Sequence, residues 1–288
     1  MPVIETSTNG QASGSAQFDV TAVRQGRAER LTDRLAEESP VALVYNDEPY
    51  VVMMATPRDL EDFALGFSLT EGLISDASEM LEMRVTPLGE EADNGYQIDM
   101  RIPDERWQAL SERRRNLSGR SGCGLCGAQS ISTAIRHPRR VSAGLQVNEQ
   151  ALYRALGSIR QLQEINAITG AIHAAAWARK TGEVVALRED VGRHNALDKL
   201  IGALVRRGED FNGGFVLVTS RASYEMVLKS AVMGIALMMA ISAPTAFAIR
   251  LAEEAGMTLI GFARENRYVI YSCPGRVEGL DVVQEAMH

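Results

Sequence analysis

The sequence predicts an α/β protein with a mostly parallel sheet, extended by a smaller N-terminal portion that contains antiparallel strands. In the C-terminal half, short apolar runs alternate with segments of helical period. Strands that alternate with helices form parallel sheets covered on both faces, because each crossover helix returns the chain to the same edge. The N-terminal apolar runs lack this alternation and are joined by short polar turns, which favours antiparallel pairing.

The N-terminal part is expected to be a tail followed by short strands and one helix. Residues 1–25 are rich in Ser, Thr, Gly, Ala and Gln without a sustained apolar period, which predicts a disordered tail, with regular structure from near Asp33. After it we expect a hairpin of strands at 41–45 and 50–54, a helix that starts at Thr56-Pro57, two strands within 81–103, and a basic helix or loop at 104–120.

The C-terminal half supplies the parallel sheet. We expect helices at 148–165, 171–180, 196–206, 224–232 and 246–255, and strands at 184–187, 215–219, 236–240 and 259–262. The apolar stretch 231–249 is nearly long enough to span a bilayer. Because Gly, Ser and Pro interrupt it and charged helical segments flank it, we interpret it as a helix end, a buried strand, a loop and the next helix. The expected organisation is a tail (1–25), a β/α portion (26–120), a flexible cysteine loop (121–135) and an α/β core (136–288).

Composition and charge restrict the class of protein. Hydrophobic residues make up 45% and charged residues 23% of the 288 residues, as in ordinary soluble enzymes. A net charge of -7 argues against a general nucleic-acid binder, since duplex affinity rests largely on Lys and Arg. Three cysteines are too few for a disulfide framework, and the first residues lack the pattern of a signal peptide. We therefore expect a cytoplasmic protein without a membrane span.

A glycine-rich loop, Ser121-Gly-Cys-Gly-Leu-Cys-Gly127, carries two of the three cysteines. Glycines leave the backbone accessible to a partner, and the arginines just before the loop favour the thiolate, the reactive form of cysteine. Cys123 and Cys126 therefore suit a nucleophilic thiol that accepts a persulfide sulfur. A single Cys-x-x-Cys is also typical of half a zinc site or of a redox dithiol. Cys273 and His173 are the candidates for the other zinc ligands, but neither has a paired ligand spacing. These alternatives stay open.

A second segment, Arg188-Glu-Asp-Val-Gly-Arg-His-Asn-Ala-Leu-Asp-Lys199, gathers many polar side chains between a predicted strand and a predicted helix. Such corners carry ligand-binding loops in open α/β sheets. We expect Asp190 and His194 to orient a ligand or to move a proton; the alternative is a polar connection with exposed helix charges. His173, in a small-residue segment, is either structural or catalytic.

Two further strand ends suit anions. Thr219-Ser-Arg-Ala-Ser223 combines hydroxyls and an arginine with the amides of a helix start, which is typical of a phosphate pocket. Its alternative role is ordinary helix capping by Ser. Gly261-Phe-Ala-Arg-Glu-Asn-Arg267 follows the last predicted strand, and its two arginines suit a phosphate or another anion. The alternative is a solvated loop.

Taken together, these segments closely resemble the FdhD family, the sulfurtransferase accessory proteins of formate dehydrogenase. The resemblance covers roughly residues 25–275 in the same order, and the segment 188–199 is its most specific part. The matching segments are 57–72, 121–127, 169–173, 188–199, 218–221 and 261–264.

The resemblance implies a cytidine-deaminase-like three-layer α/β core, a homodimer and sulfur transfer. Such proteins receive persulfide sulfur from a cysteine desulfurase and pass it to the molybdenum bis(molybdopterin guanine dinucleotide) cofactor before the cofactor enters formate dehydrogenase. By position, Cys123 matches the persulfide cysteine, and Cys126 matches a second cysteine that relays sulfur or resolves a disulfide. His173 is followed by two alanines and lacks the glutamate of the deaminase His-x-Glu pattern, so deamination is not expected.

The resemblance also implies the residues that bind the cofactor, for which a guanine nucleotide would serve as a mimic. The segment 262–267 matches the cofactor-binding segment of the family. The expected cofactor-binding residues are Phe262, Ala263, Arg264, Glu265, Asn266 and Arg267, with Thr219, Ser220, Arg221, His194 and Asp190. Two other functions stay open: a zinc or redox dithiol protein, and a non-catalytic chaperone of the cofactor.

Overall fold

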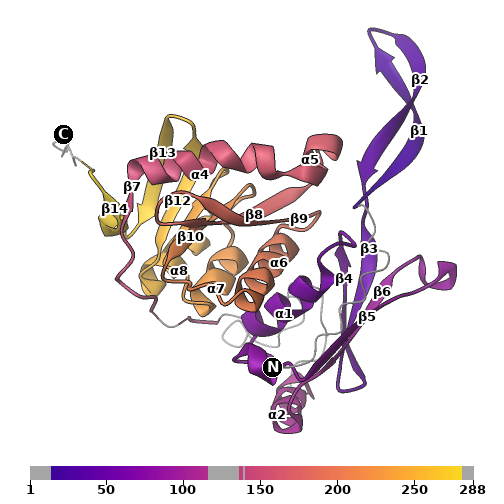
Figure 1. The fold of residues 1–288 in the computed structure, drawn as a ribbon, viewed down its shortest axis with the longest axis horizontal. Coiled ribbons are helices and arrows are strands. Elements are labelled where there is room, and N and C mark those ends of the chain that lie inside the picture. Colours follow the sequence, from indigo (N-terminus) through magenta and orange to yellow (C-terminus); the bar gives the residue numbers. More distant parts are fainter. Residues whose placement is uncertain (1–13, 116–135, 139, 281–288) are drawn as a thin grey trace. The chain divides into compact units, whose positions relative to one another are not determined.

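The computed structural model describes residues 14–115, 136–138 and 140–280, and the chain forms two compact units (Figure 1). The first unit comprises residues 1–137, 161–175 and 186–209, and the second comprises residues 138–160, 176–185 and 210–288. The sequence suggests consecutive portions, whereas each unit here combines segments that lie far apart in the sequence.

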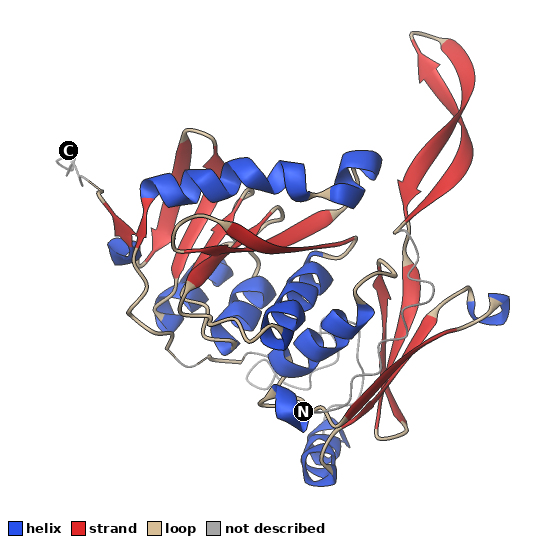
Figure 2. Cartoon of the chain, in the orientation of Figure 1, coloured by secondary structure: helices blue, strands red, loops and turns tan. Residues whose placement is uncertain are grey.

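The strands form sheets of different sizes within the described residues (Figures 1 and 2). The order of the largest sheet is β13-β12-β11-β10-β8-β9, and a four-stranded sheet has the order β4-β3-β6-β5. The strands are β1 (Ser15–Arg24), β2 (Arg27–Ala36), β3 (Ser39–Tyr45), β4 (Glu48–Ala55), β5 (Glu82–Pro87), β6 (Tyr96–Arg101), β7 (Val147–Asn148), β8 (His173–Arg179), β9 (Val184–Asp190), β10 (Gly214–Val218), β11 (Leu237–Ala240), β12 (Thr258–Arg264), β13 (Arg267–Ser272) and β14 (Val277–Glu278).

The described residues also form α-helices and short 3-10 turns. They are α1 (Leu60–Thr70), α2 (Asp104–Arg115), α4 (Glu149–Leu162), α5 (Glu164–Thr169), α6 (Arg193–Arg206), α7 (Tyr224–Val232) and α8 (Ala246–Ala255), with 3-10 turns at Ala77–Glu79, Glu90–Ala92 and Pro274–Arg276.

In the first unit, one face of the four-stranded sheet carries the core. Strand β3 pairs antiparallel with β4 and parallel with β6. Its alternate residues Val41, Leu43 and Tyr45 are at most 1% exposed, because successive side chains of a strand point to opposite faces. Tyr45 shares a 2.7 Å hydrogen bond with Ser68 of α1 and stacks on Trp107 of α2. Helices α1 and α2 therefore cover this face, and the strands expected within residues 41–103 are confirmed.

Two glycines let α1 and α6 pack with their backbones in close approach. A Cβ atom on Gly66 would lie 1.8 Å from the backbone oxygen of Asp198, and one on Gly202 would lie 2.0 Å from the backbone oxygen of Asp62. Both glycines are therefore required for space. Thr70 adds a buried hydrogen bond of 2.8 Å from its hydroxyl to the carboxylate of Asp198. Helix α6 is thus held closely against α1 along its length.

Strands β1 and β2 form a two-stranded hairpin where the sequence predicts a tail (Figure 2). The expectation of disorder is wrong for residues 15–24, which form β1. Gln25 and Gly26 make the turn, and both have the positive φ (48° and 79°) that a tight hairpin connection requires. Phe18 and Leu31 remain 52% and 39% exposed. Because the hairpin buries so little apolar surface, its sequence lacks the alternation of apolar and polar residues that predicts a half-buried strand.

The second unit contains the parallel part of the largest sheet. Strands β10, β11 and β12 pair in parallel, and β13 pairs antiparallel with β12. Figure 1 shows α4 on one face of these strands and α7 and α8 on the other. Residues 215–218 of β10 are fully buried, as expected for a strand covered on both sides. The mixed α/β class is confirmed, whereas the cytidine-deaminase-like arrangement stays a prediction.

The prediction of a helix at 171–180 is wrong, because residues 173–179 form strand β8. Residues 174–178 of β8 are at most 2% exposed. Alanine has the highest intrinsic helix propensity, but propensity is a weak signal that tertiary packing overrides. The Ala-rich run supplies small side chains for the interior of the sheet, and a four-residue connection leads from it into β9.

Other elements differ in their limits. The helix expected at Thr56-Pro57 begins at Leu60, with Asp59 at its N-cap. The helix expected at 148–165 is divided at Gln163 into α4 and α5. Strand β13 adds to the expected elements, because the sequence predicts only a loop at a strand end for residues 261–267. The apolar stretch 231–249 holds the end of α7, β11, a loop and the start of α8, as expected, and none of the described helices is long and apolar enough to cross a bilayer.

Candidate functional site

In the second unit, the loops that follow β10, β11 and β12 meet at one edge of the sheet. The carboxyl ends of parallel strands are where open α/β sheets bind ligands. Backbone hydrogen bonds connect the loops: Ile241 donates to Val218 (2.9 Å), and Thr245 donates to Ala222 (3.0 Å). The amide of Phe262, on β12, donates to a carbonyl of the β11 loop (3.2 Å). The expected residues 219–221 and 262–267 therefore lie on neighbouring loops of one edge.

Phe262 has an unusual backbone conformation within β12. Its φ is 50°, and the pairing with β13 is irregular between Gly261 and Arg264. A non-glycine residue at positive φ is strained, and such strain concentrates at functional sites, as do β-bulges. The bulge leaves the Phe262 side chain 44% exposed, although the preceding residues 258–261 are buried. Gly261 must lack a side chain, since a Cβ there would lie 2.6 Å from Pro244.

The arginines of this edge are exposed. One Nη of Arg264 donates to the backbone oxygen of Ile241 (2.5 Å), which ties β12 to the β11 loop. The guanidinium groups of Arg221 and Arg267 form no hydrogen bond or ion pair with the part of the chain that the structure describes. Free guanidinium groups on the same sheet edge as an exposed ring suit a nucleotide, because guanidinium binds phosphate and the ring can stack on a base.

The remaining expected residues of this edge differ in exposure. Glu265 and Asn266 are exposed and form the two-residue turn between β12 and β13. Thr219 is partly exposed. Ala263 and Ser220 are 1% and 4% exposed, and the hydroxyl of Ser220 donates to the backbone oxygen of the next residue. Ala263 and Ser220 therefore shape the loops rather than offer a free polar group to a ligand.

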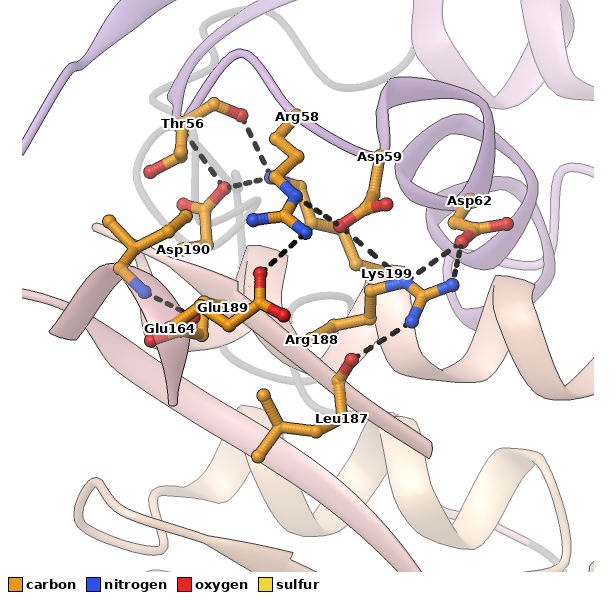
Figure 3. A network of polar contacts seen from close by, with 11 residues as sticks. Thr56, Arg58, Asp59, Asp62, Glu164, Leu187, Arg188, Glu189, Asp190 and Lys199 are labelled. Atoms are coloured by element: carbon orange, nitrogen blue, oxygen red, sulfur yellow. Dashed lines mark hydrogen bonds and ion pairs between the residues drawn. The ribbon is translucent and has the colours of Figure 1, made fainter. Parts of the chain in front are cut away.

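In the first unit, three consecutive charged residues at the end of β9 each hold a different element (Figure 3). Arg188 donates from Nε and Nη2 to Oδ2 of Asp62 on α1 (2.9 and 2.6 Å). The carboxylate of Glu189 accepts two backbone amides in the first turn of α5 (2.8 and 2.9 Å). Asp190 binds the turn between β4 and α1 through the amide of Thr56 (3.0 Å). Most charges of the segment 188–199 therefore have structural partners.

Asp190 is the centre of a buried network. It pairs with Lys199 at 2.6 Å between Oδ2 and Nζ, and both side chains are fully buried. Its other oxygen accepts hydrogen bonds from the amide of Gly192 (2.7 Å) and from Nδ2 of Asn195 (3.0 Å). Nζ of Lys199 also donates to the backbone oxygen of Thr56 (2.8 Å). Burial lowers the pKa of Lys199, although the carboxylate opposes this shift.

The network leaves Arg193 and His194 as the partly exposed side chains of this corner, at the start of α6. His173, at the start of β8, is also partly exposed. Burial lowers the pKa of His173, and the positive charge of Arg193 lowers it further. Arg193 belongs to the segment 188–199 but is not among the expected cofactor-binding residues. Its position as the first residue of a helix that follows a buried strand could have indicated it.

The expected residues thus fall into separate places. The segments 219–221 and 262–267 share one edge in the second unit, whereas Asp190 and His194 belong to the first unit. Cys123, Cys126 and the expected loop 121–135 lie outside the described residues. Cys273, which precedes a 3-10 turn, is half-buried. Within the described part of the chain, no group of three or more His, Cys, Asp or Glu residues could hold a metal ion.

Comparison with known proteins gives consistent results. The chain is 52% identical to a protein of Xanthomonas euvesicatoria pv. vesicatoria named sulfur carrier protein FdhD, over 94% of this chain and 95% of the relative. A protein of the same name from Cupriavidus necator is 48% identical, over 91% and 89%. A solved structure from Desulfotalea psychrophila, described provisionally as a formate dehydrogenase accessory protein, shares the fold with a TM-score of 0.71 at 24% identity, over 91% of this chain and 99% of that one.

The model of the FdhD/NarQ family matches residues 36–278, which include both cysteines of the loop and every expected cofactor-binding residue. With that match and about half of all residues identical to relatives along nearly their whole length, this chain belongs to the FdhD/NarQ family.

Proposed function

We propose that this protein is a cytoplasmic sulfur carrier that receives persulfide sulfur on Cys123 and delivers it to the molybdenum bis(molybdopterin guanine dinucleotide) cofactor of formate dehydrogenase. The observation that carries the proposal is the similarity, over 94% of the chain, to a protein named sulfur carrier protein FdhD. The glycine-rich sequence around Cys123 supports it, since a carrier thiol has to enter the sites of two partners.

The first transfer is a thiol–persulfide exchange. The thiolate of Cys123 attacks the outer sulfur of the persulfide on a cysteine desulfurase. A new S–S bond forms on Cys123, the bond within the donor persulfide breaks, and the donor leaves as a thiolate. In the second transfer, Cys126 attacks the inner sulfur of the Cys123 persulfide. The two cysteines are oxidised to a disulfide, and the outer sulfur leaves as hydrosulfide for the metal of the cofactor, which is the substrate. A cellular dithiol then reduces the disulfide.

The edge at the ends of β10, β11 and β12 is the proposed binding place for the guanine nucleotide parts of that substrate. Exposed Phe262 would stack on a base, and Arg221, Arg264 and Arg267 would bind the phosphates. The backbone contacts between the loops support this assignment, because they hold the edge in place before the ligand binds. His194 is proposed as a separate cofactor contact of the first unit, and Asp190 is proposed to hold the corner that carries His194.

The test of sulfur transfer is intact-protein mass spectrometry after incubation with a cysteine desulfurase and cysteine. We expect a mass gain of one sulfur atom that reduction removes and that peptide mapping assigns to Cys123. Cys123→Ala should lose the adduct, and Cys273→Ala, which changes a cysteine outside the loop, should keep it. An adduct that persists in Cys123→Ala, or none in the wild-type protein, would contradict the proposal.

The test of substrate binding uses GDP as the mimic. Changing Arg221, Arg264 and Arg267 together to Ala should weaken GDP binding by at least about tenfold, since charge-assisted hydrogen bonds to phosphate are each worth about 1.5–3 kcal/mol. Arg160→Ala removes an exposed arginine of α4 and is the matched control. Unchanged affinity in the triple variant would remove this edge from the proposal. Light scattering of the purified protein would test the proposed homodimer.

A further inference from the structure

Three basic side chains gather beside the polar network of the first unit. His173 is the first residue of β8, and Arg193 and His194 are the first residues of α6; we call these three residues the basic cluster. Strands β8 and β9 are neighbours in the sheet and are joined by a short connection, so they run antiparallel. The start of β8 therefore lies beside the end of β9, from which the chain enters α6. Both Arg193 and His194 lower the pKa of His173 through their charge.

Arg193 has no acceptor for its buried donor. Its Nε is shielded from water and forms no hydrogen bond, and its guanidinium has no ion pair with the residues that the structure describes. Buried donors are almost always paired in native proteins, because leaving one unpaired costs roughly 1–3 kcal/mol. The position of Arg193 therefore indicates that an acceptor is missing.

Among the described residues, Asp190 is the acidic group whose charge acts on His173, and its carboxylate cannot serve as that acceptor. Its carboxylate already binds Lys199, Asn195 and two backbone amides, and it is fully buried. Its negative charge is matched by Lys199, so the basic cluster is left with an excess of positive charge.

The corner that carries the cluster is fixed by the surrounding protein. The amide of Gly192, just before Arg193, donates to Asp190, and so does the side chain of Asn195, just after His194. The amide of Val191 donates to Oγ1 of Thr56 (3.1 Å). Arg193 and His194 are thus held in place before any ligand arrives, which lowers the entropic cost of binding an anion.

We propose that the basic cluster is a binding site for a phosphate group. The planar guanidinium of Arg193 matches the oxygens of phosphate, and the imidazole of His173 offers an N–H donor to the same group, with His194 next to it. A bound dianion supplies the acceptor that Nε of Arg193 lacks, and it balances the positive charge of Arg193. This inference adds Arg193 and His173 to the residues that the proposed function assigns to ligand binding. The assignment of the phosphate to a nucleotide rests on the proposed function.

The direct test is a titration with inorganic phosphate, followed by NMR of the four histidines at constant ionic strength and pH. His→Gln variants assign the signals. We expect saturable shifts of His173 and His194, and none of comparable size at His137 or His288. Arg193→Gln should weaken this binding by at least about tenfold, as the loss of a charged donor predicts. Arg84→Gln removes an exposed arginine of β5 and should leave the binding unchanged.

A second titration with GDP identifies the source of the phosphate. Weaker GDP binding in Arg193→Gln would assign the site to a nucleotide phosphate, and unchanged GDP binding together with lost phosphate binding would assign it to free phosphate. Either result is independent of the mass gain at Cys123 and of the Arg221, Arg264 and Arg267 variant. The site would be disproved if phosphate shifted all four histidines alike, shifted none, or bound Arg193→Gln as tightly as the wild-type protein.

Discussion

At the scale of single residues, the segment 188–199 divides its polar side chains between two tasks. Arg188, Glu189 and Asp190 point to three different elements, and Lys199 closes the network from α6. In the sequence, their variety of charges suggests a catalytic or ligand-binding role, but in the structure these residues bind other parts of the same unit. Arg193, between the anchored residues, keeps a buried Nε without a hydrogen-bond partner among the described residues, and His194 beside it is partly exposed.

Lys199→Met should be strongly destabilising. Removing the lysine leaves the carboxylate of Asp190 buried without its counter-charge, and breaking a buried pair in this way costs about 3–5 kcal/mol. The free energy of unfolding in urea is the measurement. Lys180→Met, at the exposed turn after β8, is the control and should change it by less than about 0.5 kcal/mol. A loss below about 1 kcal/mol in Lys199→Met would show that the pair is not essential.

His173 should make stability depend on pH. The folded protein lowers the pKa of His173, so the unfolded chain takes up its proton first as the pH falls. The free energy of unfolding therefore decreases as the pH drops below about 6.5, the ordinary pKa of histidine. His173→Gln should show a smaller decrease between about pH 7.5 and about pH 5.5, measured by urea unfolding in buffers without phosphate. Equal decreases in the two proteins would contradict the assignment.

At the scale of elements, packing decides which residue types are required. The closest contact between α1 and α6 is made by Gly66 and Gly202, whose missing side chains admit the backbone of the opposite helix. Helix propensity alone disfavours glycine at both positions. Each glycine therefore lowers the intrinsic stability of its own helix, but it allows the backbones of α1 and α6 to approach closely.

Two glycine-to-alanine changes should have opposite effects. Gly202→Ala places a Cβ atom 2.0 Å from the backbone of Asp62, and such overpacking should cost about 3 kcal/mol or more. Gly157→Ala, at an exposed position of α4 with no atom within 4 Å of the added Cβ, should stabilise by about 0.5–1 kcal/mol. Thermal and urea unfolding of both variants provide the measurement. A tolerated Gly202→Ala would mean that α1 and α6 do not pack this closely.

At the scale of the whole molecule, the two units are interleaved along the chain. The first unit needs residues 186–209 to complete it, although residues 1–137 supply most of its length. Arg188, Lys199 and Gly202 lie in this later segment, and each of them contacts a residue between positions 54 and 70. A cut between the expected N-terminal portion and the expected core therefore separates groups that are buried together.

The fragment 138–288 should not fold stably by itself. It contains most of the expected α/β core but lacks Thr56 and Asp62. Arg188 therefore loses its carboxylate partner Asp62, and Lys199 keeps Asp190 but loses the backbone oxygen of Thr56. We expect poor dispersion in its NMR spectrum and no cooperative unfolding in urea, in contrast to the full chain. Adding residues 1–137 as a separate chain should restore both properties. A fragment that unfolds cooperatively without this addition would contradict the interleaved arrangement.

The sequence by itself determined the α/β class, most of the strands and helices of the C-terminal half and the family, because apolar period and short motifs are local properties of the chain. It also pointed to residues 219–221 and 262–267, since each follows a buried strand. Only the tertiary structure decided that residues 15–24 form a strand and that the Ala-rich run 171–180 joins a sheet. Neither has a local signal, since the first buries little surface and the second has a composition that favours helix.

Tertiary structure also decided which polar residues are structural. Asp190 and His194 look alike in the sequence as members of one polar segment. Asp190 is fully buried against Lys199, whereas His194 is partly exposed at the start of a helix. The difference depends on partners more than 100 residues away, such as Thr56, whose amide donates to Asp190 and which no pattern within the segment reveals. The sequence thus determined the chemical groups that are present, and long-range packing decided which of them a ligand can reach.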